Sequence, residues 1–292
     1  MASQIAFVTC GKFPHGTDDD RLAIPHLEAL GYTVATPLWN DPDVEWTSFA
    51  LVVLRSTWDY YYYPNVQQFI GWLKRLDALH VPLRNEVDTV LWNLDKRYLR
   101  EFEKAGIRII PYVILEPGQA VNLRALLDAQ GWPRAVVKPT ISAGAYQTLL
   151  TSRDEADAHQ AHLESILLDR GALVQPFIPQ IQSDGEWSLF YFNREYSHAI
   201  IKRPNSGDFR IQGGEVAPTH PTGSILAEAA KVMEQVAGPL LYARVDGIVI
   251  DGQLWLMELE LAEPGLFLAH DDGAPERFAR AIHLEIVAAL ER

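Results

Sequence analysis

The sequence is poor in cysteine: Cys10 is the single one among 292 residues. An internal disulfide and a cysteine-based zinc site are therefore excluded. Long apolar runs are also missing, since segments such as 51–54 and 135–137 fall far short of the ~20 residues that span a bilayer. The chain enters a strand-like segment at 5–8 without a basic region and a cleavage site, which argues against a secretory signal. We expect a cytoplasmic protein with no membrane partner.

Positive charge is scarce as well. The sequence has 25 Lys and Arg against 38 Asp and Glu, which gives a net charge of −13. Because nucleic acid binding needs a basic face, nucleic acid is excluded as a main partner. A phosphate ligand remains open, since a few cations in one cleft would suffice for it.

Several common catalytic signatures are absent. There is no G-x-x-x-x-G-K-[ST] phosphate loop, no G-x-G-x-x-G after a strand, no H-E-x-x-H and no G-x-S-x-G. His159 and His162 stand three apart, but without a nearby third ligand a solvated helix face explains them better than a metal site. Cys10 is expected to be a small buried residue at the end of the first strand rather than a nucleophile. What remains is a set of candidate residues distributed along the chain.

The apolar pattern predicts an α/β plus α+β fold. Residues 1–87 alternate strands and helices as an open parallel sheet does, and the later strands pair as antiparallel hairpins with tight turns at 193–195 and 251–252. We expect strands at 5–8, 33–36, 49–54, 135–138, 147–150, 173–177, 187–192, 196–202, 241–250 and 254–261, and helices at 20–30, 65–79, 88–104, 154–168, 224–237 and 274–290. This order predicts a parallel α/β domain at 1–87, a small α+β unit at 88–170 and a larger antiparallel α+β unit at 171–292.

Two groups of cations lie beside small-residue loops. Lys138 ends an apolar strand and precedes the segment 142–145, Ser-Ala-Gly-Ala. A cation next to such a loop can hold phosphate, because backbone N–H groups approach closely where side chains are small. A plain turn explains this feature equally well on its own. Lys202, Arg203 and Arg210 concentrate positive charge in a second Gly-containing loop, for which a solvated surface loop is the alternative.

Three carboxylates form the most specific candidate group. Glu258 and Glu260 are two apart on one expected strand, so they share a face, and Asp246 lies on its hairpin partner. Carboxylates on adjacent strands repel one another unless a cation neutralises them. Oxygen-only ligands suit Mg²⁺, which also bridges nucleotide phosphates. A partly solvated acidic sheet face is the alternative.

The chain from about residue 93 to residue 264 resembles the ATP-grasp superfamily, in particular glutathione synthetases and ribosomal-protein glutamate ligases. The matching segments are Asn-Leu-Asp-Lys at 93–96, Val-Val-Lys-Pro at 136–139, the small-residue flap at 142–147, Gln-Pro-Phe-Ile at 175–178, and Arg203 with the loop at 207–214. The family often has Asn at the position of Glu260, but a carboxylate binds magnesium equally well. The flap has fewer glycines than that of many relatives.

This resemblance implies an ATP-grasp fold with ATP and Mg²⁺ as cofactors. It assigns the nucleotide to Lys96, Lys138, Ser142, Gly144, Gln175, Phe177 and Ile178, the metal to Asp246, Glu258 and Glu260, and stabilisation of the transferring phosphoryl group to Arg210, Arg203 and Lys202. Relatives often assemble as homo-oligomers, although no surface of this sequence can be read as an interface.

Leu-Arg-Ser-Thr-Trp-Asp-Tyr at 54–60 and the segment 91–99 are similar to a narrower group, the compact ATP-grasp proteins that include the O-ureido-serine cyclo-ligase of cycloserine biosynthesis. Open α/β sheets bind ligands beyond the carboxyl ends of their strands. We therefore expect substrate contacts from the polar residues that follow the third strand, with domain-interface packing as the alternative: Arg55, Ser56, Thr57 and Asp59. A planar guanidinium could hold a substrate carboxylate through two hydrogen bonds.

The leading functional hypothesis is an ATP-dependent carboxylate–amine ligase that forms an acyl phosphate on a small amino-acid-like substrate. Intramolecular cyclisation of O-ureido-D-serine to D-cycloserine is its most specific version. An ATP-grasp kinase that phosphorylates a hydroxyl and a nucleotide-binding module without catalysis remain as alternatives. Free phosphate in addition to ADP would separate the ligase from the kinase.

Overall fold

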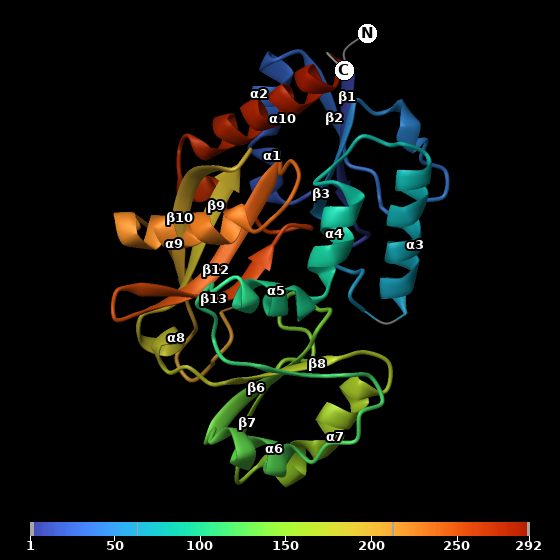
Figure 1. Cartoon of the computed structure of the whole chain (residues 1–292). Helices are drawn as coiled ribbons and strands as arrows, with labels where there is room; N and C mark the ends of the chain where they lie inside the picture. Colours follow the sequence, from blue (N-terminus) through green and yellow to red (C-terminus); the bar gives the residue numbers. More distant parts are fainter. Residues whose placement is uncertain (1–2, 63, 212, 291–292) are drawn as a thin grey trace.

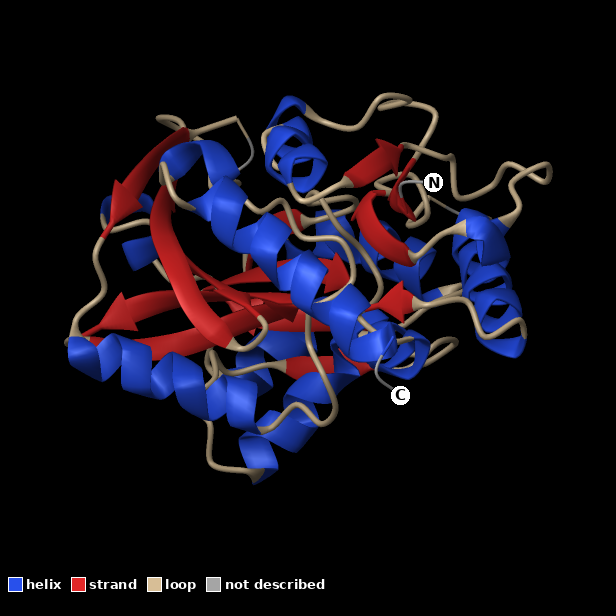
Figure 2. Cartoon of the chain, turned by 90° about the horizontal axis from the view of Figure 1, so that it is seen from above, coloured by secondary structure: helices blue, strands red, loops and turns tan. Residues whose placement is uncertain are grey.

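The computed structural model describes residues 3–62, 64–211 and 213–290. Their strands form three sheets, one each in the N-terminal, central and C-terminal parts of the chain. The central sheet, with its two helices, lies apart at the lower end of the molecule in Figure 1. Helices flank the strands on both sides in the view from above (Figure 2).

The N-terminal sheet is parallel, as expected, with the order β2-β1-β3-β4. Its strands are β1 (Ser3–Thr9), β2 (Tyr32–Ala35), β3 (Leu51–Ser56) and β4 (Leu83–Arg84), joined by α1 (Asp18–Arg21), α2 (Ile24–Ala29), η1 (Trp46–Ser48) and α3 (Asn65–Ala78). The single helix expected at 20–30 is two short ones. Thr17 caps α1, and Pro25 lies in the first turn of α2, where a proline starts a helix readily.

The central sheet has the order β5-β8-β6-β7. It consists of β5 (Val113–Leu115), β6 (Arg134–Pro139), β7 (Leu149–Ser152) and β8 (Ala172–Pro176), covered by α6 (Leu123–Gln130) and α7 (Ala156–Leu167). Because β8 pairs with β6 and β5, the central unit extends past residue 170. The boundary predicted between residues 170 and 171 therefore falls too early.

The C-terminal sheet is antiparallel, with the order β11-β10-β9-β12-β13. Its strands are β9 (Glu186–Phe192), β10 (Glu195–Arg203), β11 (Glu215–Thr219), β12 (Tyr242–Ile250) and β13 (Gln253–Glu260), accompanied by α8 (Gln180–Ser183) and α9 (Gly223–Glu234). Both predicted hairpin turns are confirmed: Asn193 and Arg194, and likewise Asp251 and Gly252, have positive φ, as the tight turn between twisted strands requires. Asp246 lies directly opposite Glu258 in the resulting register.

The helix expected at 88–104 is interrupted at Asp95. That residue is extended (φ −101°, ψ 119°) and its carboxylate caps the short turn that follows. The segment therefore reads α4 (Val87–Leu94), η2 (Lys96–Tyr98) and α5 (Leu99–Lys104). This break carries the chain from the N-terminal core into the cleft described below.

The last helix joins the first and third sheets. After η3 (Leu268–His270), α10 (Ala274–Leu290) packs Phe278 against Phe7 of β1 and Phe192 of β9, with ring centroids 6.1 and 5.1 Å apart. Figure 1 shows α10 lying across the end of the molecule that carries β1 and β2. The N-terminal and C-terminal sheets thus share one apolar core. None of the described helices is both long and apolar enough to span a bilayer.

Candidate active site

An open cleft is lined by both the central and the C-terminal sheets. β6 and β8 contribute one wall, and β12 and β13 contribute the other. The two walls carry different chemistry: apolar side chains with Gln175 and Lys138 on one side, and Arg244 with three carboxyl groups on the other. The cleft collects seven residues predicted for the nucleotide and three for the metal, which are Lys96, Lys138, Ser142, Gly144, Gln175, Phe177, Ile178, Asp246, Glu258 and Glu260.

The apolar end of the cleft offers a flat, mostly buried surface with one unpaired amide. Gln175 is 5% exposed, and its Nε2 has no hydrogen-bond partner. Phe177 is covered on its other side by the guanidinium of Arg134, 4.3 Å from the ring centroid. Because an unpaired buried donor is unfavourable, this end of the cleft is suited to a planar ligand that carries an acceptor.

Two lysines meet one glutamate in the middle of the cleft. Lys96 Nζ lies 2.9 Å from Glu258 Oε1 and donates to the main-chain oxygen of Ser142 at 2.8 Å. Lys138 Nζ lies 3.7 Å from Glu258 Oε2. Burial lowers the pKa of Lys138, with Glu258 opposing this shift. The glutamate thus holds two cations together at the point where the flap begins.

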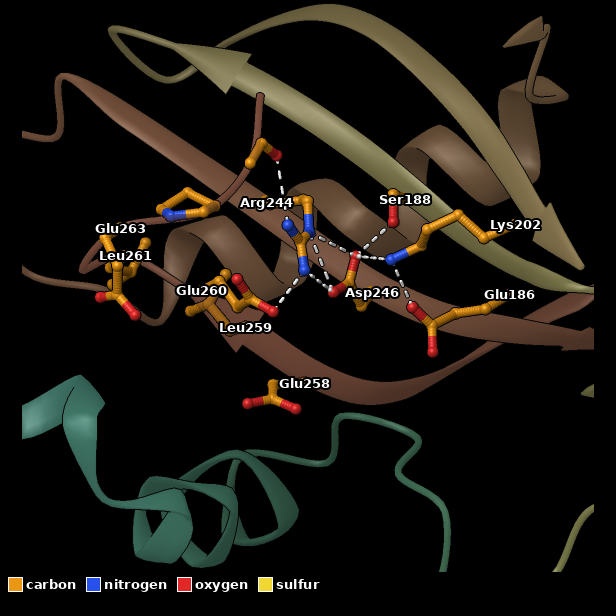
Figure 3. A network of polar contacts seen from close by, with 12 residues as sticks. Glu186, Ser188, Lys202, Arg244, Asp246, Glu258, Leu259, Glu260, Leu261 and Glu263 are labelled. Carbon is orange, nitrogen blue, oxygen red and sulfur yellow. Dashed lines mark hydrogen bonds and ion pairs between the residues drawn. The ribbon is translucent and has the colours of Figure 1, made fainter. Parts of the chain in front are cut away.

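The other two predicted metal ligands are bridged by Arg244 (Figure 3). Its guanidinium pairs with Asp246 at 2.7 Å and also with Glu260. Burial would raise the pKa of Asp246, but Arg244 and Lys202 hold it at about 2. Burial raises the pKa of Glu260 to about 8, against the opposing effect of Arg244.

The three carboxylates predicted for the metal do not form a ready-made cluster in this arrangement, so their role as metal ligands stays a prediction. Among residues 3–62, 64–211 and 213–290, no three or more His, Cys, Asp or Glu side chains are grouped so that they could hold a metal ion. The physical reason is that protein cations supply the neutralisation that the sequence pattern seemed to require from a metal. Arg244 stands beside Asp246 and Glu260, and the lysines stand beside Glu258.

The three cations predicted for phosphoryl transfer are not brought together. Arg210 lines the cleft, where it pairs with Asp208 at 3.1 Å. Lys202 is buried and pairs with Glu186 at 2.6 Å, and neither it nor Arg203 lines the cleft. Arg210 lies in the loop after β10, whereas Lys202 and Arg203 end that strand. Arg244, which the sequence did not single out, faces the cleft instead.

The predicted substrate contact of Arg55 is wrong. Its side chain is 1% exposed, its Nε lies 2.9 Å from Asp20 Oδ1, and its Nη2 donates to the main-chain oxygen of Pro264 at 2.9 Å. A guanidinium in this position has no free face for a substrate carboxylate. Domain-interface packing, the alternative given above, describes this residue correctly.

The three neighbours of Arg55 do not line the described cavities either. Ser56 is fully buried and lies 2.8 Å from the hydroxyl of Thr9. Thr57 is also fully buried. Asp59 accepts the indole N–H of Trp39 at 2.6 Å. Their predicted role in binding substrate is therefore not supported, and they serve the packing at the end of β3.

The sequence reading missed a second, smaller cavity that adjoins the cleft. It is lined by Tyr60, Asn93 and Glu263 together with Lys96, Glu258 and Glu260 of the cleft itself. Glu263 stands three residues after Glu260 in the acidic run, and that spacing is the signal that could have found it.

This combination of three sheets and an ion-rich cleft defines the class of the protein. D-alanine–D-alanine ligase from Bacillus anthracis, solved in complex with ATP, superposes with a TM-score of 0.70 and 18% identity, over 99% of this chain and 98% of that one. The fold is therefore that of the ATP-grasp enzymes, and the chain is an ATP-grasp ligase.

The comparisons with known proteins also define the family. Residues 5–85 match the family model described as "D-cycloserine synthetase DcsG, N-terminal domain". The cycloserine biosynthesis protein DcsG of Streptomyces lavendulae is 31% identical over 278 residues, which cover 88% of this chain and 91% of that protein. The crystal structure of D-cycloserine synthetase DcsG superposes with a TM-score of 0.85 and 26% identity, over 97% of this chain and 100% of that one. The chain belongs to the DcsG family.

Proposed function

We propose that this ligase uses Mg-ATP to convert the carboxylate of a small amino-acid-like substrate into an acyl phosphate, which a nitrogen nucleophile then captures. In its most specific form, the proposal is the conversion of O-ureido-D-serine to D-cycloserine, in which the ureido nitrogen that is bonded to oxygen closes the ring and water removes its carbamoyl group as carbon dioxide and ammonia. One observation carries it: a single cleft gathers two lysines, an unpaired amide and three carboxylates in a chain that is 31% identical to a cycloserine biosynthesis protein.

The nucleotide occupies the cleft with its base at the apolar end. Gln175 has a free donor for the base, and Phe177 and Ile178 supply the apolar contact. Lys96 and Lys138 lie next to each other beyond them, where they neutralise the phosphates. The flap at Ser142 and Gly144 closes over these groups. Gly144 has a φ of +58°, and an added Cβ would lie 3.2 Å from the hydroxyl of Tyr61, so a side chain there would strain this segment.

The donor set of the cleft fits magnesium. Asp246, Glu258 and Glu260 offer carboxylate oxygens, which are the ligands Mg²⁺ takes in proteins. When bound, the ion supplies positive charge to the phosphates of the nucleotide.

Arg210 and Arg244 are the guanidinium groups that line the cleft near the carboxylates. We assign to them the stabilisation of charge on the transferring phosphoryl group. Lys202 does not contact the phosphoryl group itself. Its ammonium group lies 3.7 Å from Asp246 and holds that carboxylate in position. The substrate carboxylate attacks the γ-phosphorus and ADP leaves. The nitrogen nucleophile then attacks the acyl carbon and phosphate leaves.

The test is to measure ADP and phosphate release with Mg-ATP across D- and L-amino acids, dipeptides and O-ureido-serine. We expect substrate-dependent release of both products, which falls to background in Glu258→Gln. Glu234→Gln is the matched control, because Glu234 is an exposed residue at the end of α9. ADP release without free phosphate would instead identify a kinase. Release that no compound stimulates would contradict the proposed ligase reaction.

A further inference from the structure

Glu263 is a buried carboxylate that faces a small cavity without a cation partner. It is 6% exposed and lines the small cavity beside the cleft. Figure 3 shows its carboxylate without a contact to the ion pairs around Arg244. Its Oε2 accepts no hydrogen bond. Across the part of the chain that the structure describes, no Lys, Arg or His nitrogen lies within 4.0 Å of it.

The other acidic residues around the cleft differ from Glu263 in this respect. Glu186 pairs with Lys202, Glu258 pairs with two lysines, and Glu260 pairs with Arg244. Burying a carboxylate without such a partner is unfavourable. The consequence is visible in its acidity, since burial raises the pKa of Glu263 to about 7.

The main chain around Glu263 is fixed, which keeps the carboxyl group in the cavity. Trp58 donates its indole N–H to the main-chain oxygen of Glu263 at 2.9 Å. Arg55 donates to the main-chain oxygen of the next residue, Pro264, at 2.9 Å. Tyr60, which is 3% exposed, lines the same cavity, and its hydroxyl donates to the carboxylate, which lowers the pKa of Glu263 against the larger effect of burial. Arg55 of β3 and Trp58 thus fix the main chain at Glu263 and Pro264 without lining the cavity, whereas Tyr60 lines it.

We propose that Glu263 binds the ammonium group of the amino-acid-like substrate. The inference rests on the proposed ligase function and adds a recognition site to it. A substrate ammonium group brings the positive charge that the protein does not supply at this position. The cavity shares Lys96, Glu258 and Glu260 with the nucleotide cleft. Since both groups of an α-amino acid are bonded to one carbon, an ammonium group at Glu263 keeps the substrate carboxylate close to this cavity, which adjoins the nucleotide cleft.

The test compares ligands with and without the ammonium group in binding titrations that require no turnover. The probes are O-ureido-D-serine against 3-(ureidooxy)propanoate, and D-alanine against propanoate, each titrated calorimetrically in the presence of Mg and a non-hydrolysable ATP analogue. We expect the wild-type protein to bind the ammonium-bearing member of a pair on the order of 10- to 100-fold more tightly. Glu263→Gln should remove most of this preference and leave nucleotide affinity unchanged.

Two further variants keep the result interpretable. Glu263→Asp retains the charge and should keep part of the preference, whereas Glu234→Gln should keep all of it. Glu263→Gln should melt at a temperature no lower than that of the wild type, because the carboxylate has no cation to lose. The proposal is overturned if wild type prefers neither ammonium-bearing ligand, or if Glu263→Gln weakens both members of a pair equally. If the wild type preferred ammonium-bearing ligands but released neither ADP nor phosphate, the ligase reaction would be rejected and the ammonium site would be retained.

Discussion

Trp58 donates its indole N–H to the main-chain oxygen of Glu263 at 2.9 Å, across 205 positions of sequence. The donor follows β3 of the N-terminal sheet, and the acceptor follows β13 of the C-terminal sheet. The N-terminal domain therefore shapes the substrate side of the site through main-chain contacts. Of the residues at and after the end of β3, Tyr60 lines the cavity, whereas Arg55, Ser56, Thr57 and Asp59 do not.

Trp58→Phe is expected to weaken substrate binding selectively. The ring keeps its packing, but one buried hydrogen bond is lost, which is worth about 1 kcal/mol and corresponds to roughly a fivefold rise in KM for the amino-acid substrate. KM for ATP should not change, because the nucleotide cleft is lined by other residues. Steady-state kinetics with each substrate varied in turn measures both constants. Trp132→Phe, in the core of the central unit, is the matched control. Equal increases in both KM values would show that the hydrogen bond has no positioning role.

Arg55→Met should destabilise the fold rather than weaken substrate binding. Asp20 is 3% exposed and loses its ion-pair partner in this variant, and breaking a buried pair in this way costs about 3–5 kcal/mol. Urea unfolding measures the loss. The double variant Asp20→Asn with Arg55→Met removes the unpaired charge and should recover part of the stability. If the variant were as stable as the wild type but had a higher KM for the substrate, Arg55 would be a substrate-binding residue after all.

The position of a side chain could be predicted where a local sequence pattern determines it. It could not be predicted where the side chain is held by a partner far away in the sequence. Glu258 and Glu260 follow the two-residue period of a strand, and Lys138 ends an apolar strand, so their place in the cleft follows from sequence. Arg55 has its partner Asp20 35 positions away, beyond a helix that breaks in two. The pattern at the end of β3 could not distinguish a guanidinium that is buried in an ion pair from one that faces a ligand.

The sequence also did not predict that Arg244 neutralises the carboxylates of Asp246 and Glu260. Arg244 is two residues from Asp246, so both side chains lie on one face of β12, yet only the fold brings Glu260 to the same guanidinium. The interruption of the expected helix at Asp95 has the same origin. The main-chain N–H of Lys96 donates to Thr140 of the central unit at 2.9 Å, a contact that no helical pattern can reveal.

Asn93→Ala is expected to disturb the strand that carries the acidic residues. β13 is an edge strand, and the side chain of Asn93 covers it by donating to the main-chain oxygen of Leu259 at 2.8 Å and accepting from the N–H of Leu261 at 2.7 Å. These two contacts bracket Glu260. Each buried group left unpaired costs about 1–3 kcal/mol. We expect lower stability in urea together with weaker ATP binding by calorimetry. Lower stability with unchanged nucleotide affinity would mean that β13 holds its position without Asn93.

His198 should make the fold sensitive to mild acid. The ring is 4% exposed, stacks on Phe190 with centroids 4.3 Å apart, and its Nε2 lies 3.0 Å from the main-chain oxygen of Leu266. Because that oxygen only accepts, Nε2 carries the proton, and Nδ1 is left to accept from the hydroxyl of Ser197 at 2.9 Å. Burial lowers the pKa of His198 to about 4.

An unfolded histidine has a pKa of about 6.5, so between these two values the unfolded chain binds a proton that the folded chain does not. Stability should therefore fall as the pH decreases from about 6.5 to about 4, by up to about 3 kcal/mol from this residue alone. Urea unfolding at pH 7, 6, 5 and 4 measures the dependence. His198→Gln should be less stable at pH 7 but should lose less stability over the same interval, since glutamine does not titrate. Parallel curves for the two proteins would assign the acid sensitivity to other groups.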